Sequence, residues 1–418
     1  MTGDSRLVRQ TPVFYGWVIL VAGTLGMIMT SPGQTYVISM FVDHFIADLA
    51  TDRTTVSALY MGATLAGSLA LPSIGRFIDS KGSRKAVVVI TLAFGLVCLC
   101  MSQVHGLVTL ACGFVGMRML GQGSLSLVSA NVINQWWVRR RGAVMGLSGM
   151  AAALLGTGLF PPLVNRLIGQ LGWRHAFVVL GLLLLLVMLP LGWLLFRDSP
   201  ERYGLRTDGE PPEPPTEEVQ PLPVDGWTLG EARRTPIFWV VSAGLACIAM
   251  LITALHFHVV SIFEDSGLSR TVAADIFFPI AATTSVITLA SGILKDRFSV
   301  KYLLAASLLF MGSSVLLAGH LQSFYLALTY GFCLGATAGL FRTVSGVVWA
   351  DLFGRAHLGA ISGLATTILV AGSALGPLPL GYAKDMLGSY SSALTVSSLL
   401  PFILAISVIM VPAPGRQT

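Results

Sequence analysis

The chain has 418 residues, of which 54% are hydrophobic and only 11% are charged. Soluble globular domains carry about 25% charged residues, so this chain has too few charges to cover a water-facing surface. The composition therefore excludes a soluble globular protein and predicts a protein that is surrounded by a lipid bilayer.

Twelve stretches are apolar and long enough to cross a membrane, which takes about 20 residues in a helix. Lipid offers no partner to backbone N–H and C=O groups, so each stretch is expected to be helical. Ser31-Pro32-Gly33 predicts a kink within the first span. The predicted spans begin near Phe14, Val56, Ala86, Leu107, Val144, Ala176, Ile237, Ala273, Tyr302, Phe324, Leu358 and Ser391.

The basic residues are divided unevenly between the two sides of these spans. Of the 26 Lys and Arg residues, 19 fall on the side of the N-terminus, 5 on the other side, and Arg118 and Arg342 inside spans. Because cytoplasmic loops are enriched in Lys and Arg, both termini are expected in the cytoplasm and the chain in the inner (cytoplasmic) membrane. This bias explains the net charge of +6 without a nucleic-acid partner. The polar N-terminus lacks a signal peptide, so the first span is expected to target the chain.

The polar chemistry that an enzyme or a metal site would need is missing from the sequence pattern. The five cysteines fall in predicted spans, and an odd, buried set argues against disulfides and a metal site. The short loops hold no metal-ligand cluster, nucleophile-and-base pair or phosphate-binding loop. We therefore expect no cofactor, no metal and no enzymatic activity, and a chain that acts as a monomer. These cysteines are Cys98, Cys100, Cys112, Cys247 and Cys333.

Residues 197–228 differ from the rest of the chain, because they are rich in Pro and Glu and include Pro211-Pro212-Glu213-Pro214-Pro215. Such a composition cannot bury a core and predicts a mobile cytoplasmic linker. The predicted domains are therefore residues 1–196, the linker, and residues 229–418. Residues 229–234 are expected to form a short interfacial helix before the seventh span.

The two halves repeat with one offset. Gly75 and Asp79 recur 217 residues later as Gly292 and Asp296 (292 − 75 = 217), and Pro162 recurs as Pro379. One offset from the second span to the fifth indicates two halves that share a fold and run parallel. The predicted fold class is an all-α membrane protein with twelve transmembrane helices in two pseudo-symmetric six-helix bundles. Transporters of this kind bind their substrate at the midplane between the halves.

The loops after spans two and eight contain the same pattern. In each loop a Gly allows close helix packing, an Asp lies near a helix end, and basic residues follow. An ion pair there can form when the cytoplasmic side is shut and break when it opens. The predicted gating residues are Gly75, Asp79, Arg84, Gly292, Asp296 and Arg297.

These paired loops resemble the signature loop of the major facilitator superfamily. Residues 118–123 in span four and residues 172–174 before span six are also similar to motifs of that superfamily. Residues 31–34, Asn131 with Trp136-Trp137, and residues 234–239 resemble its monocarboxylate and oxalate–formate exchanger branch. The resemblance covers nearly the whole chain and implies a secondary transporter that works by alternating access.

The sequence departs from the expected transporter patterns in three spans. The branch commonly binds carboxylates with a basic residue in span eight or eleven, but residues 273–294 contain no Lys or Arg before the cytoplasmic loop. Span eleven has Thr366-Thr367 in its middle and no Lys before Lys384. The Gly-Pro antiporter pattern of span five is also missing. Neither the substrate nor the coupling mode therefore follows from the resemblance alone.

Arg118 and Arg342 lie deep in predicted spans, where a charge costs about 2.5 to 3.5 kcal/mol. No acidic residue lies comparably deep. A cationic cavity favours an anion, and Arg binds carboxylates with a bidentate fork, so both are predicted to bind a small organic anion. Arg118 has a structural alternative, in which it bonds carbonyls of span one or four. Arg342 has no counterpart in the first half, where Leu125 takes its place.

Three residues are candidates for proton coupling, namely His256, His258 and Asp275. The two histidines point to different faces of a helix, so at most one is expected to line a cavity. Each candidate has a structural alternative, which is a histidine bonded within the helix packing or a carboxylate at a helix N-terminus. Further polar residues predicted to bind the substrate are Gln34, Asn131, His256, Tyr36, Tyr60 and Tyr330.

The leading hypothesis is transport of a small, monocarboxylate-like organic anion, driven by protons or by a counter-anion. The alternative is export of a larger amphipathic metabolite or drug, which the missing antiporter pattern and the buried arginines disfavour. A membrane sensor would need a sizeable soluble output domain, and the longest cytoplasmic segment is only the Pro-rich linker.

Overall fold

The structure is a computed structural model that describes residue 8 and residues 11–209, 226–295, 297–354 and 358–412. In these ranges the chain is helical, and the only β feature is an isolated bridge between Gly226 and Gly354. Within the described residues, eleven helices are long and apolar enough to cross a membrane. The remaining predicted span is helical from Leu107 to Trp136 but is divided into three segments and contains Arg118. The predicted all-α membrane fold is confirmed.

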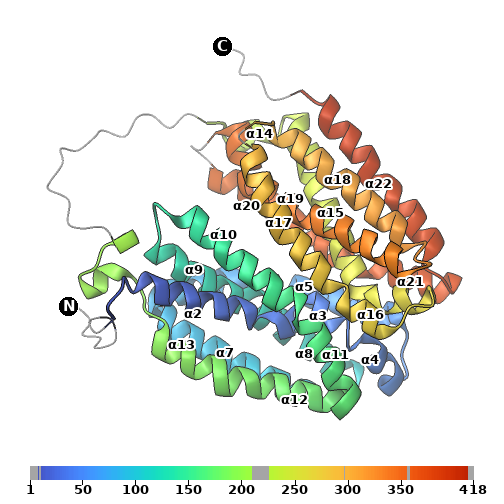
Figure 1. Ribbon diagram of the computed structural model, residues 1–418, viewed down its shortest axis with the longest axis horizontal. Helices are drawn as coiled ribbons and strands as arrows, with labels where there is room; N and C mark the ends of the chain where they lie inside the picture. Colours follow the sequence, from blue (N-terminus) through green and yellow to red (C-terminus); the bar gives the residue numbers. More distant parts are fainter. Residues whose placement is uncertain (1–7, 9–10, 210–225, 296, 355–357, 413–418) are drawn as a thin grey trace. The chain divides into compact units, whose positions relative to one another are not determined.

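The chain folds as two compact units, Met1–Ala50 with Gly62–Glu218, and Thr51–Met61 with Val219–Thr418. The helices of the first unit are α2 (Gly16–Ile28), η1 (Ser31–Gly33), α3 (Thr35–Ile38), α4 (Val42–Leu49), α6 (Leu71–Lys81), α7 (Ser83–Met101), α8 (Leu107–Gly116), η2 (Met117–Leu125), α9 (Ser126–Trp136), α10 (Arg141–Ala151), η3 (Ala152–Gly158), α11 (Phe160–Leu171), α12 (Trp173–Leu183), η4 (Leu184–Met188), α13 (Leu189–Leu195), η5 (Pro200–Tyr203) and η6 (Thr207–Gly209). Among these, α7 packs against both α12 and α13 (Figure 1).

The helices of the second unit are α14 (Leu229–Ala232), α15 (Pro236–Asp265), α16 (Arg270–Asp275), α17 (Phe277–Lys295), α18 (Val300–Ala318), α19 (Phe324–Phe353), α20 (Leu358–Leu375), α21 (Pro377–Leu387) and α22 (Ser391–Met410). Helix α18 packs between α19 and α22 (Figure 1). The start of α5 (Arg53–Leu69) belongs to this unit, because Thr54 donates its amide to Asp385 at 2.7 Å and the Tyr60 ring lies 4.7 Å from that of Phe257. The predicted short helix before the seventh span is α14, which Thr228 and Glu231 close with a capping box.

Helix starts repeat with the offset that the sequence shows. Helices α5 and α16 begin at Arg53 and Arg270, which are 217 residues apart (270 − 53 = 217). The same offset relates the starts of α7 and α18, of α8 and α19, and of α10 and α20. The halves differ in regularity, since η2, η3 and η4 are π-helical while α19 is one uninterrupted helix. Such π segments are frequent at functional sites.

The predicted kink of the first span is confirmed. The 3₁₀ turn η1 separates α2 from α3. A Cβ atom on Gly33 would lie 2.4 Å from the carbonyl oxygen of Met117 and 3.0 Å from Cα of Gly121. Glycine at this position therefore allows η1 to touch η2, which carries Arg118.

Residues 197–209, predicted as the start of a mobile linker, are bound to the first unit. Asp198 accepts a hydrogen bond from the amide of Arg84 at 3.3 Å, and its carbonyl accepts one from the Trp136 indole at 3.0 Å. The carboxylate of Asp208 accepts from the amides of Val138 (2.9 Å), Arg139 (2.8 Å) and Arg140 (3.0 Å). These contacts fix the chain to the ends of α7, α9 and α10. Residues 210–225, the rest of the predicted linker, lie outside the described residues, and the predicted domain boundaries stay a prediction.

Asp208 has a φ of 59°, in the left-handed region that Asp and Asn tolerate better than other side chains. Burial acts to raise the pKa of this carboxyl, but the three amide hydrogen bonds and the charge of Arg140 outweigh it, so the pKa lies below its usual value. A carboxylate with a lowered folded-state pKa stabilises the fold above its unfolded pKa of about 3.9. That stabilisation is lost as the pH falls through the folded-state pKa.

Replacing Asp208 with Ala is expected to lower the unfolding temperature of the purified protein in detergent at pH 7. The three amides before α10 lose their acceptor, as when a helix cap worth about 0.5 to 2 kcal/mol is removed. Asp208→Asn keeps an acceptor and tolerates the backbone angle, so its unfolding temperature should fall less. Equal unfolding temperatures for all three proteins would contradict a stabilising role of this carboxylate.

Helices α17 and α19 of the second unit pack along a seam of small residues. Thr284 donates to the carbonyl of Gly335 at 3.2 Å, and the hydroxyls of Ser291 and Thr343 lie 2.6 Å apart. A Cβ atom on Gly335 would lie 2.6 Å from the carbonyl oxygen of Ile280. Membrane helices associate through such close approach and hydroxyl bonds, because lipid supplies no hydrophobic force between them.

Gly335→Ala is expected to destabilise the second unit by about 1 to 3 kcal/mol, because the methyl group overlaps the backbone of α17. Gly346, on the same helix, faces open space. Gly346→Ala should therefore leave the stability unchanged or raise it slightly, since Ala favours a helix over Gly by about 1 kcal/mol. Denaturation of both variants in mixed micelles tests the seam, and equal effects would argue against it.

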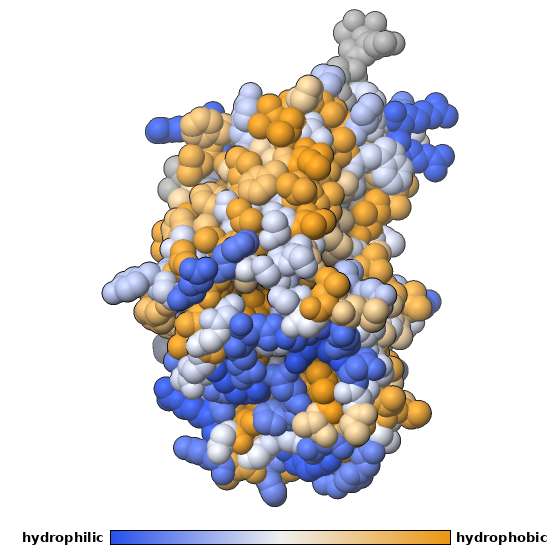
Figure 2. Space-filling model, turned by 90° about the vertical axis from the view of Figure 1, so that its right-hand side faces the viewer, coloured by the Kyte–Doolittle hydropathy of each residue, from blue (hydrophilic) through white to orange (hydrophobic). Residues whose placement is uncertain are grey.

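Large hydrophobic side chains are exposed on many of these helices, for example Leu186, Val396 and Ile403. On the face drawn in Figure 2, hydrophobic residues form broad patches and hydrophilic residues gather in a separate area. A soluble monomer rarely exposes apolar patches larger than a few hundred Å². These surfaces are therefore suited to contact with lipid.

Candidate functional site

Arg118 is almost fully buried in η2 of the first unit. Its Nε donates to Oγ1 of Thr64 at 3.0 Å, and its Nη1 lies 3.4 Å from both the carbonyl oxygen of Gly33 and Oγ1 of Thr35. The guanidinium thus joins α5 and the kink of the first span to η2. These contacts support the structural alternative for Arg118. Thr64 was not identified from the sequence, because one Thr in an apolar span carries no pattern.

Two other predicted substrate residues belong to the same kink. Gln34 donates from Nε2 to Oγ1 of Thr30 at 3.1 Å, and the hydroxyls of Tyr36 and Ser31 lie 3.2 Å apart. A Cβ atom on Gly156 would lie 3.5 Å from the Tyr36 hydroxyl, so Tyr36 also reaches η3. The structure therefore brings Gln34 and Tyr36 to the kink that Arg118 binds.

The side chains of Gln122 and Asn131 differ from those of Gln34 and Tyr36 in their hydrogen bonding. Oε1 of Gln122, one turn after Arg118 in η2, is buried without a hydrogen-bond partner in the described part of the chain. Gln122 was not among the predicted site residues, although it lies within the motif at residues 118–123. Asn131 is half-buried on α9, and its side chain makes no hydrogen bond to any other described residue. Both remain capable of binding a polar ligand.

His258 is fully buried in the second unit and uses both ring nitrogens. Its Nε2 lies 2.8 Å from the carbonyl oxygen of Pro377, and its Nδ1 lies 3.2 Å from the Tyr390 hydroxyl. A carbonyl can only accept, so these contacts assign the hydrogen to Nε2 and leave Nδ1 to accept from Tyr390. Adding a proton at Nδ1 would reverse that bond, so that the Tyr390 hydroxyl would have to turn and accept. The geometry therefore favours the structural alternative for His258.

His256 has a different environment. Its Nε2 is buried and has no hydrogen-bond partner among the described residues. Its ring lies 5.2 Å from that of Phe277, at the start of α17. Of the two histidines, His256 is thus the one with a ring nitrogen that can still accept or donate a hydrogen bond.

Arg342 is exposed although it lies within α19, a helix apolar enough to cross a membrane. His256 precedes the end of α15 by 9 residues, and Arg342 follows the start of α19 by 18 residues. At 1.5 Å per residue these positions are about 14 and 27 Å from helix ends that the predicted topology puts on one side of the membrane. The two residues therefore belong to different depths and do not form one cluster.

The other predicted residues of the second unit have simpler surroundings. Tyr60 and Tyr330 are both about 1% exposed, and Tyr330 packs 5.9 Å from the ring of Phe263. Asp275 is exposed and is the last residue of α16. Asp275 also lies two residues before the start of α17, so its interpretation as a helix N-terminal carboxylate and its proton-coupling role both stay predictions.

The gating loops contain unexpected contacts. Arg84 donates from Nε to the carbonyl of Trp193 at 2.8 Å, and its guanidinium lies 4.1 Å from the centre of that ring. A Cβ atom on Gly75 or Gly292 would meet nothing within 4 Å, so close packing is not what requires glycine there in this structure. Lys295 forms an ion pair with Asp351 at 3.5 Å, which joins α17 to α19 and was not predicted.

The structure gives less information on the remaining predicted gating residues. Arg297 is exposed. Asp296 lies outside the described residues, and the side chain of Asp79 is likewise not described. The gating role of these loops stays a prediction.

The cysteines are only partly as expected. Cys98, Cys247 and Cys333 are buried, but Cys100 and Cys112 are exposed, so the expectation of five buried packing residues is wrong for two of them. Their spans are apolar on every side, so the sequence does not distinguish a lipid-facing thiol from a buried one. No group of three or more His, Cys, Asp or Glu residues suited to a metal occurs among the described residues.

His258→Ala is expected to lower the stability of the protein by about 2 to 4 kcal/mol, because it leaves a cavity and removes the partner of Tyr390 and Pro377. His256→Ala should lower the stability clearly less, because it removes no side-chain hydrogen bond between described residues. Thermal unfolding of both variants tests this order. The reverse order would contradict the assignment of His258 as the structural histidine.

Comparison with known proteins agrees with this fold. The sequence profile described as Major Facilitator Superfamily matches residues 23–291 and 260–418. Mouse monocarboxylate transporter 11 is 27% identical over 96% of this chain and 88% of its own. A probable sulfoacetate transporter of Cupriavidus necator is 24% identical over 78% of this chain and 77% of its own.

Solved structures show the same architecture. A bacterial homologue of the human lysosomal transporter Spinster, in an inward-facing and unoccupied conformation, superimposes with a TM-score of 0.68 at 18% identity. The match covers 94% of this chain and 95% of that chain. The profile matches most of the chain, and the members of this family are transporters rather than enzymes. The chain belongs to the Major Facilitator Superfamily and is a multi-pass membrane transporter that resembles the monocarboxylate transporters.

Proposed function

We propose that the protein is a secondary active transporter that moves a small, monocarboxylate-like organic anion across the cytoplasmic membrane by alternating access. Transport is coupled to protons, and both termini lie in the cytoplasm. Similarity to a monocarboxylate transporter along 96% of the chain supports a carboxylate substrate, as does similarity to a probable sulfoacetate transporter. The chain acts as a monomer in the bilayer.

The exposure of Arg342 within α19 is the observation that carries this proposal. A charge in a membrane helix costs several kcal/mol, and such residues almost always face a water-filled cavity or the bundle interior. The next residue, Thr343, pairs with Ser291 of α17, so Arg342 itself points to a different side of α19, where it is exposed. A guanidinium there can bind a carboxylate with two parallel hydrogen bonds. In this proposal Arg342 binds the anion, and Arg118 holds the helices of the first unit together.

His256 is the proposed proton carrier. Histidine is the side chain whose unperturbed pKa lies closest to neutral pH, and Nε2 of His256 has no competing partner among the described residues. Because His256 and Arg342 belong to different depths, proton and anion bind at separate positions. One proton carried with one monocarboxylate moves no net charge, so transport should be electroneutral.

Uptake of lactate, pyruvate, acetate, formate and oxalate into proteoliposomes with an inward proton gradient tests the substrate class. We expect one of the monocarboxylates to accumulate. Arg342→Ala should reduce its uptake by about thirtyfold or more, the effect of leaving a bound carboxylate without its charge partner. Arg234→Ala, which removes an exposed arginine before α15, is the matched control and should transport normally.

Other outcomes have definite meanings. If the labelled anion accumulates only when a counter-anion is present inside the proteoliposomes, the protein is an anion exchanger and not a proton-coupled transporter. If none of the five anions moves under either condition, the small-carboxylate proposal fails. Export of larger amphipathic solutes is then the hypothesis to test.

His256→Gln should abolish gradient-driven accumulation but preserve exchange of labelled for unlabelled anion at equal concentrations, because exchange needs no net proton transfer. His320→Gln, which changes an exposed histidine just after α18, should affect neither process. Loss of both processes in His256→Gln, with normal folding, would place His256 in anion binding instead. Wild-type accumulation in His256→Gln would exclude it as the proton carrier.

A further inference from the structure

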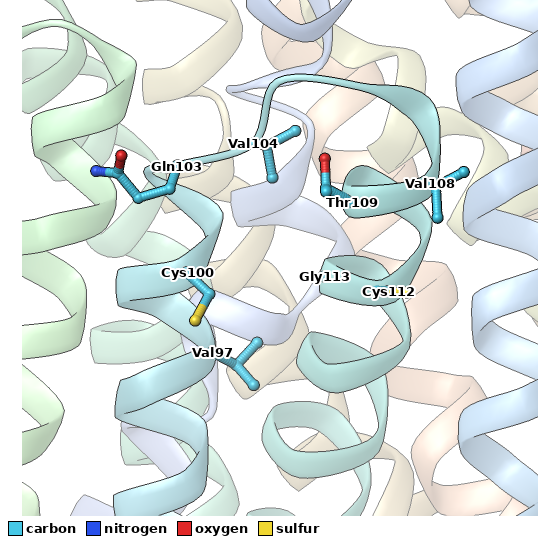
Figure 3. Close-up of a pocket in the computed structure, with 8 residues that line it drawn as sticks. All are labelled: Val97, Cys100, Gln103, Val104, Val108, Thr109, Cys112 and Gly113. Carbon is cyan, nitrogen blue, oxygen red and sulfur yellow. The ribbon is translucent and has the colours of Figure 1, made fainter.

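The first unit contains a cavity of about 370 Å³ between α7 and α8, and its lining includes no residue assigned to transport. Val97, Cys100 and Gln103 lie on its α7 side. In Figure 3, Val97 and Cys100 point from α7 toward α8, and Gln103 and Thr109 lie near the segment that joins the two helices. Eight residues line the cavity, namely Val97, Cys100, Gln103, Val104, Val108, Thr109, Cys112 and Gly113.

The lining is apolar along the helices and polar only near the connecting segment. The hydroxyl of Thr109 is already used there, because it donates to the carbonyl of Gly106 at 2.8 Å. A buried water needs two to four polar partners, and an apolar cavity does not supply them. In Figure 3 the amide of Gln103 points away from α8, and its Nε2 donates to the Ser102 hydroxyl at 3.2 Å. The chemistry of the lining therefore favours a hydrocarbon chain, with its polar end near the segment that joins the two helices.

The position of the cavity identifies the source of that chain. Helix α7 is long and apolar enough to cross a membrane, α8 begins the next predicted span, and Val108 beside the cavity is 78% exposed. Cys100 and Cys112, whose exposure was not expected, lie on the two sides of the same cavity. The medium in contact with this surface is the acyl region of the bilayer, and the polar end of the cavity lies where a span ends, at the depth of lipid ester groups.

We propose that this cavity is a lipid-binding site that takes one acyl chain of a membrane phospholipid. The acyl chain lies along Val97, Cys100 and Cys112, and the ester end of the lipid lies at the segment that joins α7 and α8. The site rests only on the membrane setting of α7 and α8, and it stands whether or not the transported substrate is a carboxylate.

A phospholipid that carries a photoreactive diazirine on one acyl chain tests the site in full-length protein reconstituted into bilayers. After illumination, mass spectrometry should place crosslinks between residues 97 and 113 more often than on other lipid-facing positions of α7. Cys100→Trp fills the cavity from α7 and should lower these crosslinks by about tenfold or more, the loss expected when roughly two methylene groups are no longer buried.

Two further tryptophan variants distinguish a filled cavity from a general effect of the substitution on folding. Cys112→Trp fills the cavity from α8 and should act like Cys100→Trp. Val89→Trp adds the same side chain to an exposed position of α7 outside the cavity and should leave the crosslinks unchanged. Each variant is also checked for its unfolding temperature and for anion uptake.

The proposal is overturned if crosslinks are spread evenly over the exposed face of α7, which would show general contact with surrounding lipid. It is equally overturned if both filling variants, folded, keep their crosslinks. Competition by a transported anion would assign the cavity to the transport route rather than to lipid. Failure of anion uptake in the wild type would affect only the proposed function, because the crosslinks do not depend on it.

Discussion

The structure depends on the cost of leaving a polar group without a partner in lipid. Arg118 forms hydrogen bonds with Thr64 and with the backbone of the first-span kink. His258 forms hydrogen bonds with the carbonyl of Pro377 and the hydroxyl of Tyr390. Hydrogen bonding of this kind removes most of the penalty for burying a polar group. Groups that are satisfied in this way hold helices together, and they are poor candidates for binding a substrate that must arrive and leave.

The same constraint singles out polar groups that remain open to a ligand. Nε2 of His256 and Oε1 of Gln122 lack hydrogen-bond partners among the described residues, and Arg342 is exposed within a membrane helix. In a transporter such groups can be completed by the substrate or by a proton. We therefore propose that Arg342 and His256 take part in transport, whereas Arg118 and His258 hold the helices of their units together. Glycines allow the close approaches on which that architecture depends, at Gly33 in the first unit and Gly335 in the second.

The sequence predicts those features that follow from composition and periodicity. Apolar length predicts the spans, the repeated offset predicts equivalent helix starts, and Ser31-Pro32-Gly33 predicts the kink. Side-chain partners are not predictable in this way, because Thr64 and Tyr390 lie far from Arg118 and His258 in the chain. The π-helical form of η2, the exposure of Cys100 and Cys112, and the binding of Asp208 to the start of α10 likewise depend on tertiary contacts. The predicted site residues therefore fall into two groups, those proposed to serve transport and those that hold the structure together, and only their contacts in the structure distinguish the groups.

Proton movement during anion transport tests the central claim most directly. Proteoliposomes loaded with a pH-sensitive dye, without an imposed gradient, receive the transported monocarboxylate from outside. Coupled transport predicts that the lumen acidifies as the anion enters, at a rate that does not depend on the membrane potential, and that Arg342→Ala abolishes the signal while Arg234→Ala keeps it. Anion entry without acidification, or entry that generates a current, would contradict electroneutral proton-coupled transport.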